Sequence, residues 1–161
     1  MGSSRTEALY FRHVVYVDRS DRSAQFFGDA AGTAKVIADR SRHRRPPYVR
    51  FIQQDFTEPL PLPEASFDLL LGLYTPGVAR ATAQYLRVGG LLVTDNHRGD
   101  ATDALTERGL NLVGSGRTRR SAVDLSFEAP AILPAQTGSP PRWSGAPDYY
   151  VFERNRDHAS R

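Results

Sequence analysis

The chain has 161 residues, 40% of them apolar and 24% charged, with a net charge of +3. This length and balance are typical of a folded protein, so we expect a single domain over residues 1–161. The absence of cysteine excludes disulfides, thiolate zinc sites and cysteine nucleophiles. No apolar run approaches the roughly 20 residues that span a bilayer. The N-terminus also has no signal-peptide core, so we predict a cytoplasmic protein with no membrane partner.

The basic residues are arginines, with the single exception of Lys35. Arginine suits phosphate and carboxylate groups because its donors form a planar fork. Nucleic-acid binders usually carry a denser basic patch, and base-composition bias in a GC-rich genome is a simpler explanation of the arginine excess. We therefore do not expect a nucleic-acid partner.

Apolar runs rich in β-branched and aromatic residues alternate with helical patterns along the chain. We predict strands at residues 14–17, 48–53, 67–74, 91–94 and 110–114, and helices at 21–40, 78–87 and 100–108. Asp100 is the expected N-cap of the last helix and Gly109 its stop, while Gly89-Gly90 breaks the helix before it. After these come a strand or extended segment at 118–128, a proline-rich loop at 129–147, a final strand at 149–152 and a flexible tail at 155–161.

Alternating strands and helices predict an α/β fold with a parallel sheet and helices on both faces. Ligands of such sheets bind outside the carboxyl ends of the strands. In this sequence those ends carry Asp18, Asp55, Tyr74 and the run Asp95-Asn96-His97. Polar side chains therefore recur where apolar strands stop, which predicts a ligand site at this edge of the sheet.

Two of these aspartates suit a nucleoside. Asp18 lies between a strand and a helix, so its two oxygens can accept hydrogen bonds from both hydroxyls of a ribose. The alternative is that Asp18 only caps the helix, because the following residues are rich in capping side chains. Asp55 can accept a hydrogen bond from an exocyclic amine while Phe56 covers the base ring, or it can open a turn before the prolines.

The order of these features resembles the class I S-adenosylmethionine-dependent methyltransferases. Ser66-Phe67-Asp68 begins a motif typical of that family's fourth strand, and VYVDRS at 15–20 is similar to its second-strand motif. The run 86–90 (LRVGG) fills the family's turn into the fifth strand, with Val88 in place of the usual proline. The resemblance covers residues 13–114, and YYVF at 149–152 fits the family's antiparallel last strand.

This resemblance implies a Rossmann-like three-layer sandwich with a mostly parallel sheet, incomplete at the N-terminus. It also implies S-adenosylmethionine as cofactor. The residues that match the family's cofactor site, or stand beside it, are Asp18, Arg19, Ser20, Asp55 and Phe56.

One motif of the family is missing from the sequence. A glycine-rich loop should follow a first strand, but the residues before Val14 contain no such loop. That strand lies centrally in the family, so its loss would leave a gap between the strands at 14–17 and 67–74, or bring them into direct pairing. We expect a truncated chain, a non-catalytic relative or a reduced sheet.

Candidate residues for an acceptor substrate follow the later strands. His97 can act as a general base near neutral pH, and Tyr74 ends the neighbouring strand. Asp95 and Asn96 are candidate substrate ligands, as is Trp143 in the loop 129–147, which is either a lid or an insertion. The alternatives are an ordinary loop histidine and a packing tyrosine. We find no metal-binding motif.

Three functional hypotheses remain open. The first is a methyltransferase acting on a small-molecule acceptor. The second is a non-catalytic interaction domain derived from that fold, which could form a homodimer to cover exposed strand edges. The third is a nicotinamide-dependent enzyme that uses Asp18 for ribose, although the glycine fingerprint that should precede this residue is missing.

Overall fold

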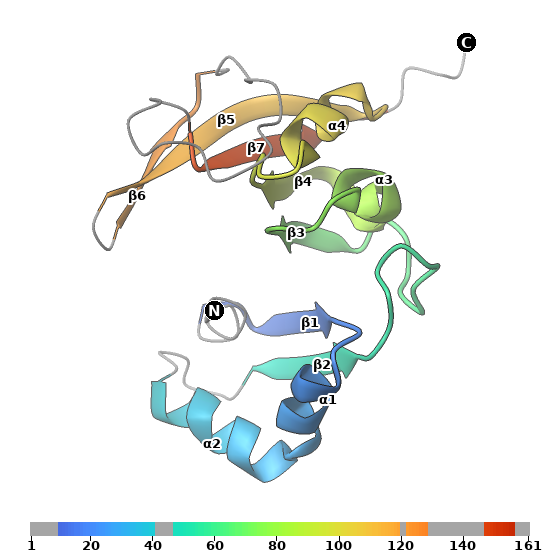
Figure 1. Cartoon of the computed structure of the whole chain (residues 1–161), viewed down its shortest axis with the longest axis vertical. Helices are drawn as coiled ribbons and strands as arrows, with labels where there is room; N and C mark the ends of the chain where they lie inside the picture. The colour runs from blue at the N-terminus through green and yellow to red at the C-terminus, as the bar shows by residue number, and fades with distance from the viewer. Residues whose placement is uncertain (1–9, 41–46, 120–121, 129–146, 157–161) are drawn as a thin grey trace. The chain divides into compact units, whose positions relative to one another are not determined.

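The computed structural model describes residues 10–40, 47–119, 122–128 and 147–156. The chain divides into two compact units, Met1–Leu60 and Pro61–Arg161. The first unit holds a two-stranded sheet and two helices, and the second holds a five-stranded sheet with its own helices (Figure 1). The expected α/β class is confirmed. Among the described residues no helix is long and apolar enough to cross a membrane.

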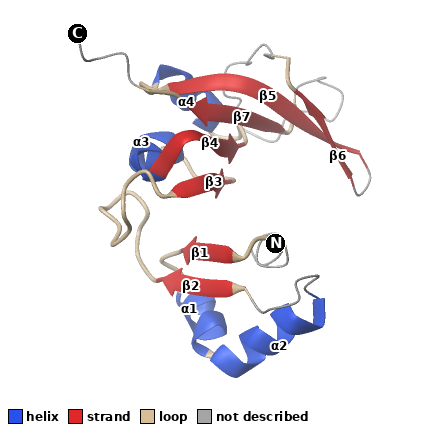
Figure 2. Cartoon of the chain, turned by 180° about the vertical axis from the view of Figure 1, so that it is seen from behind, coloured by secondary structure: helices blue, strands red, loops and turns tan. Residues whose placement is uncertain are grey.

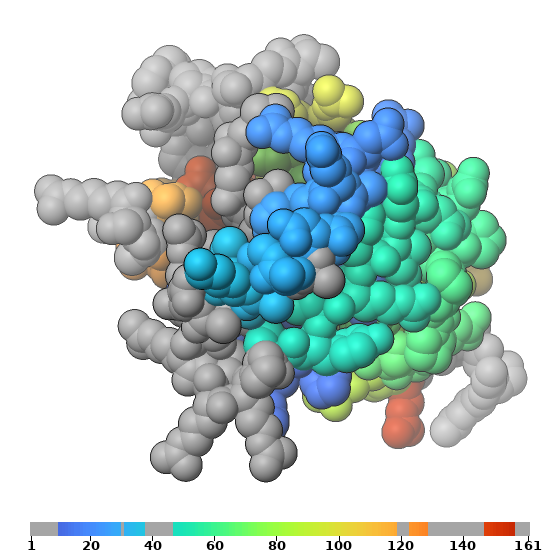
Figure 3. Space-filling view, turned by 90° about the horizontal axis from the view of Figure 1, so that it is seen from below, coloured from blue at the N-terminus to red at the C-terminus, as the bar shows by residue number. Residues whose placement is uncertain are grey.

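The first unit pairs β1 (His13–Val17) with β2 (Tyr48–Ile52) in parallel. The helices α1 (Asp21–Gly28) and α2 (Ala30–Arg40) connect the two strands and lie on one side of the sheet (Figure 2). In the space-filling view these helices form an outer layer of the unit (Figure 3). Phe27 of α1 anchors them, because its ring lies 4.8 Å from those of both Tyr16 and Phe51.

The predicted single helix at 21–40 was wrong, because the chain breaks at Asp29. This residue leaves the helical conformation (φ −80°, ψ 79°), and its carboxylate accepts a hydrogen bond from the Gly32 N–H at 2.9 Å. The aspartate side chain therefore offers the backbone an alternative to continuing the helix. The Thr33 hydroxyl fixes the joint by donating to the Phe26 carbonyl at 2.8 Å.

The sheet of the second unit has the order β3-β4-β7-β5-β6. Its strands are β3 (Phe67–Gly72), β4 (Leu86–Thr94), β5 (Leu110–Arg119), β6 (Ala122–Ser126) and β7 (Tyr149–Arg154). β3 and β4 are parallel, whereas β7 runs antiparallel to both β4 and β5, and β6 forms an antiparallel hairpin with β5. The sheet is therefore mixed. β1 and β2 form a separate sheet within the first unit.

The segment between β3 and β4 differs from its prediction. The helix predicted at 78–87 ends early, as α3 (Val78–Thr82) and a 3₁₀ turn (Ala83–Tyr85). Gly89-Gly90 does not break that helix but lies inside β4, where the register with β3 shifts. A Cβ on Gly90 would lie 2.9 Å from the carbonyl oxygens of Arg87 and Phe67, so only glycine fits this bulge.

The helix α4 (Asp100–Thr106) begins at the predicted residue, but its caps differ from the prediction. Gly99, in the left-handed conformation at φ 88°, is the N-cap, and Asp100 makes no cap hydrogen bond. The helix ends at Thr106 with Glu107 as its C-cap, so the predicted stop at Gly109 was also wrong. The Asp100 side chain is buried instead of capping the helix.

The core of the second unit forms where α3 and α4 meet the sheet. Its fully buried large apolar side chains come from two strands, β4 and β7, and small alanines of the helices complete it. These residues are Leu86, Leu92, Tyr150, Phe152, Ala79, Ala101 and Ala104. Small helical residues allow close approach of the helices to the sheet. This packing fixes the carboxyl ends of β3 and β4.

Candidate functional site

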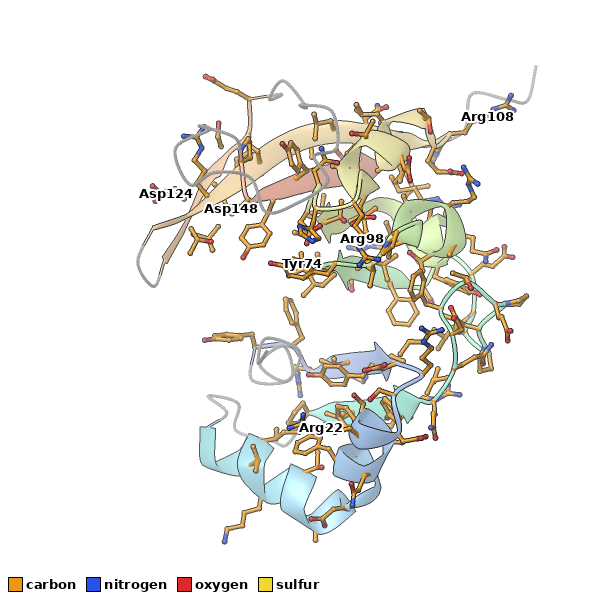
Figure 4. All side chains as sticks on the ribbon, viewed as in Figure 1. Arg22, Tyr74, Arg98, Arg108, Asp124 and Asp148 are labelled. Atoms are coloured by element: carbon orange, nitrogen blue, oxygen red, sulfur yellow. The ribbon has the colours of Figure 1, made fainter. Side chains whose placement is uncertain are left out.

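The ends of β3 and β4 bring four predicted site residues together. The strands are parallel and Gly72 pairs with Thr94, so the residues that follow them emerge at one edge. Those residues are Tyr74, Asp95, Asn96 and His97. Figure 4 shows Tyr74 at the carboxyl end of β3.

Asp95 is the centre of this group. Its side chain is 7% exposed, and its two oxygens accept hydrogen bonds from different backbone segments. Oδ2 accepts the Tyr74 N–H at 2.8 Å, and Oδ1 accepts the His97 N–H at 3.1 Å. The prediction of Asp95 as a substrate ligand remains untested, but the geometry gives it a clear positioning role.

Tyr74 and His97 present their rings at this edge. Their centroids lie 5.2 Å apart with an interplanar angle of 70°, an edge-to-face arrangement. Tyr74 is 70% exposed, and its backbone is left-handed at φ 58°, which is strained for a residue with a Cβ. A strained backbone held by a buried carboxylate is a feature that functional sites often share.

Asn96 connects this edge to α4. Its Oδ1 accepts hydrogen bonds from both the backbone N–H and the hydroxyl of Thr102, each at 3.2 Å. The Asp95 carbonyl accepts the Ala101 N–H at 3.1 Å in the same turn. The loop between β4 and α4 is thus tied to the helix by several bonds.

Asp100 is a functional candidate that the sequence reasoning did not identify. Its side chain is 1% exposed, and neither of its oxygens has a hydrogen-bond donor among the described residues. Burial, followed by the nearby charge of Asp95, raises the pKa of Asp100 to about 6, while Arg98 acts in the opposite direction. A protonated Asp100 can donate to the Asp95 carboxylate, and two ionised groups here would repel each other.

The first unit holds the predicted cofactor residues at the carboxyl edge of β1 and β2. Asp18 Oδ1 accepts the Ser20 N–H at 2.9 Å, and Oδ2 accepts the Ser23 hydroxyl at 2.7 Å. Ser20 is the N-cap of α1 and accepts the Ser23 N–H at 3.4 Å. Ser20, and not Asp18, is therefore the N-cap, while Asp18 supports the helix start through these bonds, and each of its oxygens keeps further acceptor capacity.

Asp55 follows β2 and turns the chain. Its Oδ1 accepts both the N–H and the hydroxyl of Thr57, at 3.0 and 2.8 Å, and these bonds lower the pKa of Asp55. Oδ2 lies 3.5 Å from the Arg19 guanidinium. Asp18, Arg19 and Asp55 thus belong to one edge of the first unit. Phe56 is half-buried beside them in sequence.

The remaining expectations concern pockets, metals and Trp143. A cavity of about 90 Å³ is lined by Gly77, Arg80, Asp103 and Glu107 and is small for an organic ligand. No group of histidine and acidic residues within the described ranges could hold a metal ion. Trp143 and almost all of the predicted loop 129–147 lie outside the described residues.

No family model matches the chain, and no curated protein matches it. Among solved structures, a protein from Corynebacterium glutamicum is 18% identical, with a TM-score of 0.45, over 91% of this chain and 62% of that one. A tRNA methyltransferase (TrmI) from Aquifex aeolicus is 15% identical, with a TM-score of 0.43, over 88% of this chain and 53% of that one. The chain thus spans less than two thirds of either protein.

Proposed function

We propose that this chain is a methyltransferase-like protein that uses S-adenosylmethionine and a small-molecule acceptor. The observation that carries the proposal is that both parallel strand pairs end in a polar group organised around an aspartate, Asp55 with Arg19 in one unit and Asp95 in the other. Ligands of α/β sheets bind at such ends. The antiparallel β7 agrees with the last strand that the sequence resemblance implies.

The residues of the first unit fit the nucleoside part of this cofactor. Asp18 accepts one hydrogen bond at each oxygen, so each can accept another from a ribose hydroxyl. The Asp55 Oδ2 has only a long contact with Arg19, so it can accept a hydrogen bond from an exocyclic amine. The half-buried Phe56 follows Asp55 and would cover the base.

The residues of the second unit suit an acceptor. When bound, S-adenosylmethionine supplies an electrophilic methyl group, and the protein mainly has to align the acceptor. The His97 imidazole is within ring contact of Tyr74 and would take the proton that the acceptor hydroxyl or amine loses. Asp95 would act through these two residues, because it holds their backbone N–H groups.

A second candidate function is a non-catalytic interaction domain of the same fold. It is favoured by the local bonds of the cofactor-side carboxylates, since both oxygens of Asp18 and Oδ1 of Asp55 already serve their own turns. If these aspartates only stabilise their own turns, their presence does not imply that a nucleoside binds to them.

Calorimetric titration with S-adenosylhomocysteine separates the two functions. We expect micromolar binding, weakened about tenfold or more by Asp18→Ala and by Asp55→Ala, because each loses a hydrogen bond to the ligand worth about 1.4 kcal/mol or more. Ser23→Ala removes the hydroxyl bonded to Asp18 but keeps the carboxylate, and Glu58→Ala removes a nearby exposed charge. Both controls should bind normally. No heat at about 500 µM ligand would contradict cofactor binding and favour the interaction domain.

A further inference from the structure

Among the described residues, no helix covers one face of the β1–β2 sheet. Phe27 of α1 packs on the face that holds Tyr16 and Phe51. Neighbouring residues of a strand point to opposite faces, and the register pairs His13 with Tyr48. It also pairs Val15 with Arg50, so these four residues share the face away from α1. Figures 1 and 2 show both helices on one side of this sheet.

This face and its approach present flat aromatic rings to solvent. Tyr48 is 59% exposed, and the His13 ring lies 6.0 Å from its ring. Phe11 and Tyr10, just before β1, are 44% and 69% exposed. Exposed rings are stacking platforms for nucleic-acid bases, whose flat faces all fit them.

The charge around these rings is positive. Arg12 and Arg50 are exposed, and neither has an ion-pair partner within the part of the chain that the structure describes. Residues 10–17 and 47–54 contain no acidic side chain. A single strand of nucleic acid offers phosphates and unstacked bases. Arginines beside exposed rings can contact both, because the arginines bind phosphates and the rings stack on bases.

We propose that this face binds single-stranded nucleic acid, with bases stacked on Tyr48 and Phe11 and a phosphate held by Arg50. The aliphatic residues of the face are Val15 and Val17, which are small and half-buried, and Ile52, which is buried. A surface that binds an apolar protein partner would expose larger aliphatic side chains. Arginines without an ion-pair partner would not stabilise such a complex. This proposal differs from the expectation, based on the overall composition, that nucleic acid is not a partner.

Fluorescence anisotropy of labelled 12-nucleotide oligo(U) and oligo(dT) with the full chain tests this proposal. We expect micromolar dissociation constants at about 50 mM salt and weaker binding at higher salt. Tyr48→Ala should weaken binding about tenfold without changing the salt dependence, because it removes stacking alone. Arg50→Gln should lower the slope of log affinity against log salt by about 0.7, the value for one phosphate of a single strand.

Three controls make the outcome decisive. Tyr48→Phe keeps the ring and should bind normally, which separates stacking from misfolding. Phe127→Ala and Arg108→Gln alter an equally exposed ring and arginine of the second unit and should change nothing. The proposal is overturned if no single strand binds at about 100 µM protein, or if duplex DNA binds more tightly than both oligonucleotides. It is also overturned if only vesicles containing phosphatidylserine bind, or if the controls weaken binding as much as Tyr48→Ala.

Discussion

Replacement of Asp95 by alanine should lower the free energy of unfolding by about 3 kcal/mol, because the N–H groups of Tyr74 and His97 both lose their acceptor. Asp95 accepts the N–H groups of Tyr74 and His97, and these bonds hold Tyr74 in its left-handed conformation. Urea unfolding at pH 5 measures the effect under conditions in which Asp100 is largely protonated and does not repel Asp95.

Two further variants test this reading of Asp95. Asp103→Ala removes an exposed carboxylate of α4 and should cost less than about 0.5 kcal/mol. Tyr74→Gly should relieve backbone strain and raise stability by up to about 1 kcal/mol. If Asp95→Ala costs no more than Asp103→Ala, the two N–H bonds do not hold the strand ends together.

Asp100→Asn should stabilise the protein above pH 6 by about 2 kcal/mol relative to the wild type. In the folded state burial and Asp95 raise the pKa of Asp100 to about 6, whereas in the unfolded chain an aspartate titrates near about 3.9. At a pH between these two pKa values, Asp100 is ionised in the unfolded state but still protonated in the folded state. Wild-type stability from this group is therefore complete below about pH 4 and is lost as the pH rises towards 6. Asparagine keeps a donor for Asp95 and does not titrate.

The difference in unfolding free energy between Asp100→Asn and the wild type isolates this titration. The other charged groups, including Asp103 and Arg98, are present in both proteins, so their contributions largely cancel in this difference. Urea unfolding from about pH 4 to pH 8 should show the variant gaining on the wild type until about pH 6 and a constant difference above it. A difference independent of pH, or a variant that loses stability as the pH rises, would show that Asp100 is ionised throughout this range.

Local sequence signals predicted the first and last strands well. Val14 to Val17 and Tyr149 to Phe152 are β-branched or aromatic, and both runs lie in strands. Their residue types and their length favour one conformation, so little depends on distant contacts. The polar residues after β3 and β4 were predicted to meet because parallel strands end at one edge, and the structure places them there.

The predictions were wrong where a hydrogen bond or strand pairing, and not the local sequence pattern, determines the secondary structure. Leu86 was predicted as helical, but it pairs with Phe67 of β3, and the Arg154 side chain donates to the carbonyls of Gln84 and Leu86. The spacing of apolar residues along the sequence does not indicate these contacts. The break at Asp29 depends on one side-chain bond to Gly32, which competes with a continuous helix.

The candidate site was predicted in position but only partly in roles. Asp95, expected to touch a substrate, is buried and bonded to two backbone segments. Asp100, expected to cap α4, is instead a buried neighbour of Asp95 because Gly99 takes the cap position. The signal available in the sequence was a second aspartate within five residues of Asp95, directly after a glycine.

We propose above all that the carboxyl edge of β1 and β2 binds the nucleoside of S-adenosylmethionine. An amide NMR titration of the ¹⁵N-labelled full chain with S-adenosylhomocysteine locates binding directly. We expect saturable shifts of the Ser20 and Thr57 amides, because their N–H groups donate to Asp18 and Asp55. An unchanged spectrum at millimolar ligand, or shifts confined to residues away from this edge, would contradict it.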